Sequence, residues 1–481
     1  MSVEEPHSED TTSGFGRGVL LLALANGLYV VLGYGSTAAL AHMLRPAEFG
    51  GYGVVLSWIT ILTALLVKGI ATSTAREMAS THVDAPTAWR AGAGLGMRLA
   101  IALAIVGAAI SPLASRWFGS GDLALQFAIG ALGALTFGVN AVLLAWPTGT
   151  RDYARQALTQ AAYAVARLAL TLGGAAVWGI DGAVVGYVLA PLVAAAPLVA
   201  RHPAASVELG PVRRRMLANV VPVALASVAV TGFFVVDVFA MSGVLGGSSH
   251  AVGVYVAYGT LAHVPFFLLQ ATSIAMVPAI VAAQGAGARA HAIRRTLTDT
   301  VVLLAGPTLV LVTAGDASAR VVFGSAYRVD DLVVAPLALA TAAVTMISGL
   351  IAVDVAIGRV RGALALAGLG IGGVAVAAWL AARGGALHAE RDVAWAVLAV
   401  TVVSVLAAAW HASHRHGARL DASRALRGGL VGAVACLPPL LCHDDVLRML
   451  VGVACGIAWV AAVLRLGLID IGRAASSPAD I

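Results

Sequence analysis

The strongest constraint on this chain is a succession of about 14 long apolar segments that are separated by short polar breaks. Each segment is close to the roughly 20 residues that an α-helix needs to cross the hydrocarbon core of a bilayer. Hydrophobic residues make up 60% of the 481 residues and charged residues only 11%, which is unlike the composition of a soluble domain. The sequence therefore predicts an all-α polytopic membrane protein.

The breaks between the apolar segments alternate in charge. About 21 basic residues lie in one set of alternate breaks and near the chain ends, and about seven lie in the other set. Because cationic loops stay in the cytoplasm, this pattern predicts that both termini are cytoplasmic. The first apolar run, 19–41, is too long for a cleaved signal, so we expect an uncleaved first span. The topology rule also explains the net charge of +6, and we expect no nucleic-acid partner.

The apolar segments define the expected spans and domains. The expected spans are 17–42, 51–75, 91–113, 123–147, 156–178, 181–200, 218–243, 250–280, 295–314, 331–357, 363–383, 392–411, 425–442 and 446–467. The longest break on the basic side holds an arginine run and prolines, which is typical of a linker between two bundles. The expected domains are an N-terminal six-helix lobe (1–200), a cytoplasmic linker (201–217), a C-terminal six-helix lobe (218–412), and two extra transmembrane helices with a short cytoplasmic tail (413–481).

The two lobes share short motifs at a nearly constant spacing of about 203 to 208 residues. The matched segments are FGGY at 49–52 with VGVY at 252–255, WFGS at 117–120 with VFGS at 322–325, and GTR at 149–151 with GR at 358–359. Six spans per copy is an even number, so both copies keep the same orientation, as in the parallel repeats of several transporter folds. Two pseudo-symmetric lobes around a central cavity favour transport.

Several of these motifs also resemble a known family. They are LRPAEFGGY at 44–52, GIATSTAREMA at 69–79, the segment 252–265, FGSAY at 323–327, and GR at 358–359. With these segments in this order, the chain from about 14 to 440 resembles the polysaccharide-repeat flippases (O-antigen or oligosaccharide, Wzx type). These flippases belong to the multidrug/oligosaccharidyl-lipid/polysaccharide exporter superfamily.

The resemblance implies a transporter and not an enzyme. It would flip a polyprenyl-pyrophosphate-linked oligosaccharide from the inner to the outer leaflet of a bacterial inner membrane by alternating access, for the biosynthesis of surface polysaccharide such as lipopolysaccharide. It implies no cofactor. The implied partners are the lipid-linked oligosaccharide, membrane lipids, a coupling proton or sodium ion, and glycosyltransferases or a polymerase of the same pathway.

Three other functions remain open. A lipid II flippase and a multidrug or cation extruder belong to the same superfamily, and a membrane glycosyltransferase or polymerase belongs to another class. An extruder of organic cations would favour an acidic cavity, whereas the basic residues inside the first lobe favour an anion. A glycosyltransferase would need a large outer loop, and the longest outer break, 315–330, has only about 16 residues.

Two basic residues of the first lobe lie inside predicted spans. Lys68, the only lysine, precedes Arg76 by eight residues, which places it about 12 Å from the cytoplasmic edge of its helix. An isolated cation there costs about 2.5–3.5 kcal/mol, so Lys68 is expected to contact either an acidic partner or an anionic substrate. Arg167 lies near mid-depth, where its guanidinium is able to hold a phosphate with two hydrogen bonds; buried pairing is the alternative.

The other candidates lie at a membrane edge or in the second lobe. Arg17, at the cytoplasmic mouth of the first span, is a candidate contact for anionic headgroups, although an ordinary interfacial arginine is favoured. Asp237 lies among apolar residues, where an uncompensated carboxylate is costly. It is expected either to couple transport to a proton or sodium ion or to form a salt bridge with the first lobe. Asp354 is expected to pair with Arg359 or Arg361 at the interface.

Two further patterns resemble binding motifs without their required context. The first is the histidine set His411, His414 and His416, which lies among arginines without carboxylates, so we expect no metal site. The second is the glycine series at 368, 370 and 373, which lies inside a predicted span with no strand before it. Close helix packing is therefore the favoured interpretation of these glycines.

Overall fold

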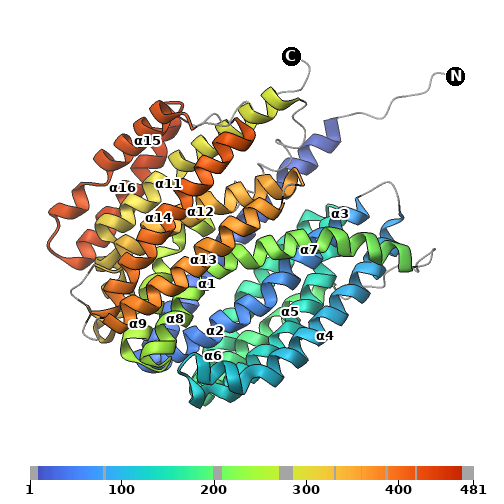
Figure 1. Cartoon of the computed structure of the whole chain (residues 1–481), viewed down its shortest axis with the longest axis horizontal. Helices are drawn as coiled ribbons and strands as arrows, with labels where there is room; N and C mark the ends of the chain where they lie inside the picture. Colours follow the sequence, from blue (N-terminus) through green and yellow to red (C-terminus); the bar gives the residue numbers. More distant parts are fainter. Residues whose placement is uncertain are drawn as a thin grey trace. The chain divides into compact units, whose positions relative to one another are not determined.

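The computed structural model describes residues 9–79, 83–198, 209–269, 285–329, 332–358, 360–384, 388–417 and 420–468. Within these ranges every regular element is a helix (Figure 1), which confirms the predicted all-α class. The chain divides into two compact units, Met1–Thr231 and Gly232–Ile481. The boundary lies inside a helix, downstream of the linker that the sequence analysis expects at 201–217, and the exact lobe limits stay a prediction.

The helices of the first unit are long and mostly apolar. They are α1 (Glu9–Met43), α2 (Pro46–Ala64), α3 (Ala71–Met78), α4 (Ala85–Trp117), α5 (Ala124–Gly149), α6 (Tyr153–Ala195) and most of α7 (Leu209–Phe233). A π-helical turn, Leu65–Ile70, joins α2 to α3, so that residues 46–78 form one continuous helical stretch. The interior is built from Leu66 and Ile70 of this turn, Leu95 of α4, and Met216 and Val220 of α7.

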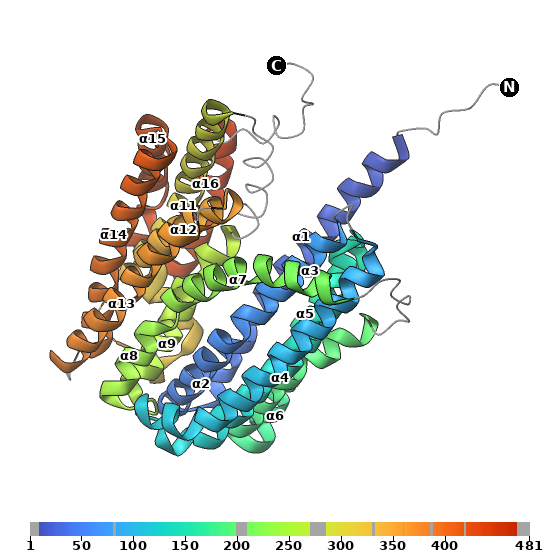
Figure 2. The same cartoon turned by 45° about the vertical axis from the view of Figure 1, so that its right-hand side comes forward.

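The second unit repeats this arrangement and adds two helices. Its elements are α8 (Val236–Leu245), α9 (His250–Ala262), α11 (Ala286–Phe323), α12 (Val334–Ala356), α13 (Val360–Gly384), α14 (Ala389–His416), α15 (Ala422–Ala435) and α16 (Asp445–Arg465). In Figures 1 and 2 the last two helices, α15 and α16, lie alongside α11.

Among the described residues, 13 helical stretches are long and apolar enough to cross a membrane. One of them, residues 153–198, contains two predicted spans, because the backbone of α6 breaks at Trp178 and at Gly179, where φ is +59°. The two halves fold back on one another so closely that a Cβ on Gly182 would lie 1.9 Å from the carbonyl oxygen of Gly174. Glycine permits this contact because it has no side chain. Since this one stretch contains two spans, the 13 helical stretches correspond to the predicted number of about 14 spans.

In the first unit, α1 and the first half of α6 run parallel in a fixed register. Residues that meet across this pair of helices are separated by 134 positions in the sequence. The pairs are Asn26–Gln160, Tyr29–Tyr163 and Gly33–Arg167. Antiparallel helices would give separations that change along the contact, so the constant value shows that the first and fifth spans point the same way.

Backbone conformations support the internal repeat that the motifs predict. Phe-Gly-Ser lies at the C-terminal ends of both α4 and α11, and its two glycines have φ of +63° (Gly119) and +84° (Gly324). Arg151 follows α5 with φ of +58°, and Gly358, 207 positions later, follows α12 with φ of +77°. The left-handed region strains side chains with a Cβ, so its recurrence at matched helix ends is a specific likeness. The prediction of two pseudo-symmetric bundles is therefore confirmed.

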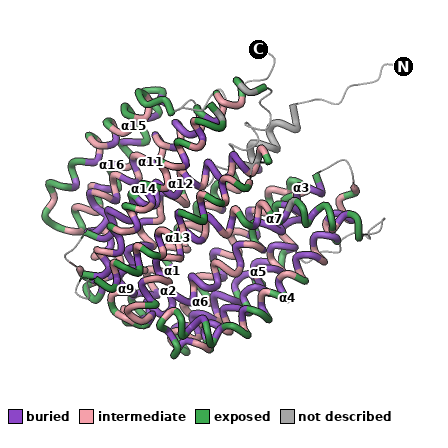
Figure 3. Tube along the Cα trace, in the orientation of Figure 1, coloured by how far each residue is buried: buried purple, intermediate pink, exposed green. Residues whose placement is uncertain are grey.

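The added helices α15 and α16 are attached to α11 at two places along it. Near the C-terminal end of α11, Arg320 donates two hydrogen bonds to Asp445, at 2.9 and 2.7 Å. In the N-terminal half of α11, Arg424 lies 3.1 Å from Asp299. Asp421 caps α15, and hydrogen bonds from the backbone N–H of Arg424 and the Ser423 hydroxyl lower the pKa of its carboxyl. Figure 3 shows exposed residues on the outward faces of these helices.

Candidate functional site

Arg167 is a half-buried cation on α6, and it lies over an aromatic ring. Its Cζ atom is 5.1 Å from the centroid of the Tyr187 ring. Tyr187 belongs to the second half of α6, which the break at Gly179 folds back against the first half. A guanidinium at this distance from a ring face is stabilised by the cation–π interaction. The hairpin of α6 thus positions the cation with residues from its own two halves.

More phenols surround the Arg167 guanidinium. Tyr187, Tyr29, Tyr163 and Tyr52 lie close enough to interact with it electrostatically, as does Tyr34 of α1. The first four come from α1, α2 and both halves of α6, and we call them the tyrosine cage. The Tyr29 and Tyr163 rings stack with their centroids 5.8 Å apart. In the described part of the chain, no carboxylate lies within ion-pair distance of Arg167. Among the residues that the structure describes, the guanidinium therefore lies beside phenols and has no carboxylate partner.

The cage continues along the α1–α6 contact as a line of polar side chains. Gln160, Tyr163 and Arg167 follow the i, i+3, i+7 spacing that places residues on one helix face. The Nε2 atom of Gln160 donates a 2.8 Å hydrogen bond to Oδ1 of Asn26 on α1. All of these side chains are partly exposed, so they form a polar surface on an otherwise apolar pair of helices.

Lys68 lies in the π-helical turn that interrupts the second span. The neighbouring Leu66 and Ile70 are fully buried, whereas Lys68 is exposed and points away from the interior of its unit. A π-helical turn widens the helix locally and is frequent at functional sites. Among the residues that the structure describes, no carboxylate lies within ion-pair distance of Lys68. The side chain of Arg17, the third predicted contact, lies outside the described residues.

Asp237 is a buried carboxylate at the start of α8, directly after the helix break at Phe234 and Val235. Its Oδ2 atom accepts a 2.5 Å hydrogen bond from the Tyr255 hydroxyl, and its Oδ1 atom accepts one of 2.9 Å from the backbone N–H of Val238. Tyr255 belongs to α9 of the same unit. The described side-chain partner of Asp237 is therefore a phenol of its own unit. The sequence suggests, as one alternative, a cation of the first lobe.

Asp354 lies close to a histidine of the same unit. His411 of α14 approaches it with Nε2 at 3.9 Å from Oδ2, and Arg359, one of the expected partners, lies outside the described residues. No group of three or more His, Cys, Asp or Glu side chains suited to a metal ion occurs among the residues that the structure covers.

The tyrosine cage is the part of the site that the sequence analysis missed. Tyr29 and Tyr163 carry a weak signal, because each is a polar aromatic residue inside a predicted span and both belong to spans of the same direction. Tyr52 belongs to the repeated motif at 49–52, which does not itself predict a contact with Arg167. Tyr187 meets Arg167 only because α6 folds back at Gly179, and no spacing in the sequence predicts that approach.

The helical bundles and the charges inside their spans define a multi-pass membrane protein with a transporter fold. The family model described as polysaccharide biosynthesis protein matches residues 15–284. The chain belongs to this family, and the resemblance inferred from its motifs is confirmed at that level. No curated protein matches the chain.

Solved structures of other transporters share the fold. The lipid II flippase MurJ in an inward closed conformation aligns with a TM-score of 0.71 and 13% identity, over 93% of this chain and 99% of that chain. An inward-facing multidrug resistance MATE family transporter of the MOP superfamily gives 0.64 and 16%, over 83% and 98%. A MOP superfamily transporter from Pyrococcus furiosus, whose binding pocket is described as reversed in polarity, gives 0.61 and 17%, over 83% and 95%.

Proposed function

We propose that this protein flips a polyprenyl-pyrophosphate-linked oligosaccharide from the inner to the outer leaflet by alternating access, for the biosynthesis of surface polysaccharide such as lipopolysaccharide. The observation that carries the proposal is Arg167, a cation inside a span whose described neighbours are phenols and not carboxylates. Such a cation attracts an anion, and its planar fork fits two phosphate oxygens. Family membership supports the polysaccharide branch.

Lys68 and Arg167 are the proposed contacts for the pyrophosphate, with Arg17 as a contact at the entrance. Lys68 supplies a compact charge on an exposed face of the second span, and Arg167 supplies a fixed guanidinium. In this role the substrate phosphate offsets the cost of placing a cation at membrane depth. This mechanism, in which a charge captures the substrate and the protein alternates its access, needs no cofactor, nucleic acid or catalytic group. The proposed partner enzymes are glycosyltransferases or a polymerase of the same pathway.

Asp237 is the proposed coupling residue of the C-terminal lobe, 218–412. It is buried and hydrogen-bonded to Tyr255, an arrangement in which gain and loss of a proton or sodium ion would change the local charge by one unit. With the N-terminal lobe, 1–200, supplying cations, the two lobes would divide substrate capture and energy coupling. The linker, 201–217, and the C-terminal segment, 413–481, complete the proposed organisation.

We infer that the protein lies in a bacterial inner membrane with both termini in the cytoplasm. Single cysteines at the exposed Ser423 and Ser248, on a background without Cys436, Cys442 and Cys455, test this orientation. In intact spheroplasts, the Ser248→Cys protein should react with a membrane-impermeant maleimide. The Ser423→Cys protein should react only after permeabilisation. The reverse labelling pattern would invert the topology.

Substrate choice is tested with purified protein in liposomes that carry a fluorescent polyprenyl-pyrophosphate oligosaccharide. A reductant added outside the liposomes destroys only the fluorophores of the outer leaflet. We expect fluorescence to be lost faster in liposomes that contain the protein than in liposomes without it, because the protein moves labelled lipid to the outer leaflet. Lipid II, which shares the pyrophosphate, is the second candidate, because the MurJ structure aligns over nearly its whole length. Faster movement of lipid II than of the oligosaccharide would establish that candidate instead. If the protein transports an organic cation and flips neither lipid, both flippase candidates are wrong and the protein is an extruder.

A further inference from the structure

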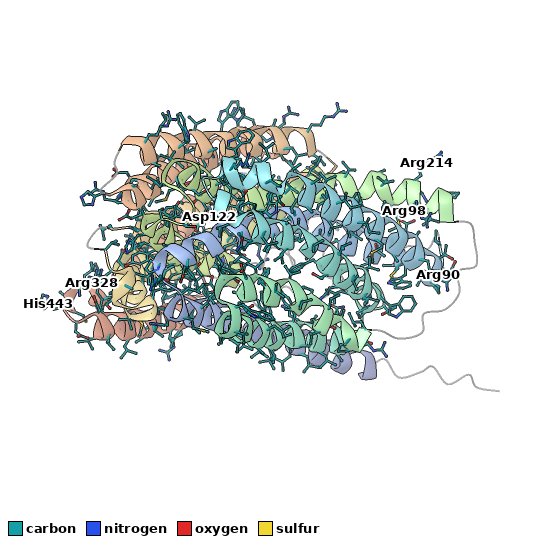
Figure 4. All side chains as sticks on the ribbon, turned by 90° about the horizontal axis from the view of Figure 1, so that it is seen from below. Arg90, Arg98, Asp122, Arg214, Arg328 and His443 are labelled. Atoms are coloured by element: carbon teal, nitrogen blue, oxygen red, sulfur yellow. The ribbon has the colours of Figure 1, made fainter. Side chains whose placement is uncertain are left out.

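A row of arginines lies along the contact between α4 and α7 in the first unit. Arg90 and Arg98 are exposed on α4, and Gly94 lies midway between them. Arg213 of α7 crosses this glycine so closely that a Cβ on Gly94 would lie 2.7 Å from its Nη2 atom. Arg214 follows on the same helix, and Figure 4 shows Arg90, Arg98 and Arg214 at the same end of this unit.

In the described part of the chain, these arginines have no acidic partners. Within the described ranges, no carboxylate lies within ion-pair distance of Arg90, Arg98, Arg213 or Arg214. Glu77 pairs with a different arginine of the same run, since its carboxylate lies 3.7 Å from the guanidinium of Arg215. The Nε atom of Arg213 is buried and has no hydrogen-bond partner in the described structure. A buried donor without an acceptor is costly, and the repulsion of like charges adds to this cost.

The length of α4 places this row at the edge of a bilayer. The helix has 33 residues and is about 50 Å long, which exceeds a hydrocarbon core of about 30 Å. The segment from Arg98 to Trp117 alone covers about 28 Å. One turn before the row's centre, the Trp89 indole donates a 3.0 Å hydrogen bond to the Val142 carbonyl, and tryptophan is enriched at membrane interfaces. Arg98 and Gly94 therefore lie at the depth of lipid phosphates.

We propose that this α4–α7 arginine row binds the phosphate of an anionic phospholipid in the cytoplasmic leaflet. The same face of α4 continues from Arg98 to Ile101 and Ile105, at the i, i+3, i+7 spacing of one helix side. Both isoleucines are exposed, at 44% and 64%. A headgroup on the arginines would place its acyl chains along these apolar residues, and this continuity favours a lipid over a free phosphate ion. Clustered arginines at this depth attract anionic lipids.

The bound headgroup has a structural consequence. Its phosphate would accept from Arg213 and neutralise the repulsion between α4 and the start of α7. Anionic lipid should therefore stabilise the folded protein, and a zwitterionic lipid of the same chain length should not. This role is independent of the transported substrate.

Native mass spectrometry and thermal unfolding of the full chain in neutral detergent test the proposal. We expect phosphatidylglycerol to remain bound and to raise the melting temperature, and phosphatidylcholine to do neither. Arg98→Gln should weaken binding of phosphatidylglycerol about fivefold. The double variant, which combines Arg98→Gln and Arg213→Gln, should weaken it by about a further fivefold. Gly94→Ala keeps every charge but displaces the flexible end of Arg213, and it should weaken binding as well. Arg116→Gln, an exposed arginine at the other end of α4, is the matched control and should bind normally.

Three results would overturn the proposal. The first is normal binding of phosphatidylglycerol by both the double variant and Gly94→Ala. The second is equal loss of binding in Arg116→Gln, which would show a general effect of net charge. The third is full stabilisation by millimolar inorganic phosphate alone, which would make the row a free-phosphate site. Because flipping of the oligosaccharide is measured separately, none of these outcomes bears on the transport proposal.

Discussion

Replacing Arg167 with alanine is expected to reduce export of the lipid-linked oligosaccharide by about 100-fold or more, while the protein still accumulates in the membrane. A guanidinium that grips two phosphate oxygens makes two charge-assisted hydrogen bonds, each contributing about 1.5–3 kcal/mol. Together they correspond to a factor of at least about 100. Arg167→Lys keeps the charge but loses the planar fork, so it should retain partial activity. Lys68→Ala should also abolish export. Complementation of a flippase-deficient strain, with immunoblots for protein level, measures these effects.

Arg155 is the matched control for Arg167. It lies on the same helix, is exposed, and pairs with Asp152 at 3.3 Å at the start of α6. An exposed ion pair of this kind contributes little, so Arg155→Ala should export at nearly the wild-type rate. If Arg167→Ala and Lys68→Ala both complement the deficient strain at normal expression, the proposed pyrophosphate contacts are wrong. Comparable loss in Arg155→Ala would indicate a general requirement for charge on α6.

Replacing Asp237 with asparagine is expected to leave the protein folded and to abolish the response of transport to an imposed proton or sodium gradient. The amide has the shape of the carboxyl group and still accepts from Tyr255, but it neither binds a proton in exchange nor carries a charge. The measurement is the flipping rate in liposomes with and without each gradient, together with the melting temperature. A folded Asp237→Asn protein with a normal gradient response would show that Asp237 is not the coupling residue.

Tyr255→Phe separates coupling from structural support. It removes the phenol that donates to Asp237 and leaves the carboxyl group in place. A buried acceptor that loses one donor costs about 1–3 kcal/mol of stability, so we expect a lower melting temperature with a retained gradient response. If Asp237 serves only in a buried ion pair, Asp237→Asn should instead leave an unpaired cation and destabilise the protein by several kcal/mol.

The sequence predicts much of the fold because membrane insertion imposes strong rules on composition. Length and hydropathy indicate each span, since a helix must satisfy its own backbone in lipid. Phe-Gly-Ser at two matched helix ends indicates the repeat, because the glycine has a positive φ in both copies. The α6 hairpin illustrates the limit. Two spans are predicted there, but their tight contact at Gly174 and Gly182 depends on the local backbone break at Gly179.

The site is less predictable, because its groups come from separate helices. The charges at Lys68, Arg167 and Asp237 are visible in the sequence, since each one is costly at membrane depth. Their neighbours are not visible. The sequence suggests acidic or basic partners, whereas the structure places tyrosines around Arg167 and beside Asp237. A phenol is apolar enough to pass unnoticed in a span, yet its hydroxyl and ring both interact with charge.

The internal repeat relates the two tyrosines that accompany the charged groups. Tyr52, in the cage around Arg167, occupies the first copy of the motif, and Tyr255, the donor to Asp237, occupies the second. A phenol presents electron density to a cation through its ring and oxygen, and it presents a proton to an anion through its hydroxyl. One residue type at matched motif positions is therefore compatible with either sign of charge. Arg167 lies in the fifth span and Asp237 in the seventh, which corresponds to the first span of the repeat, so the two units use the matched tyrosines with charges from different helices.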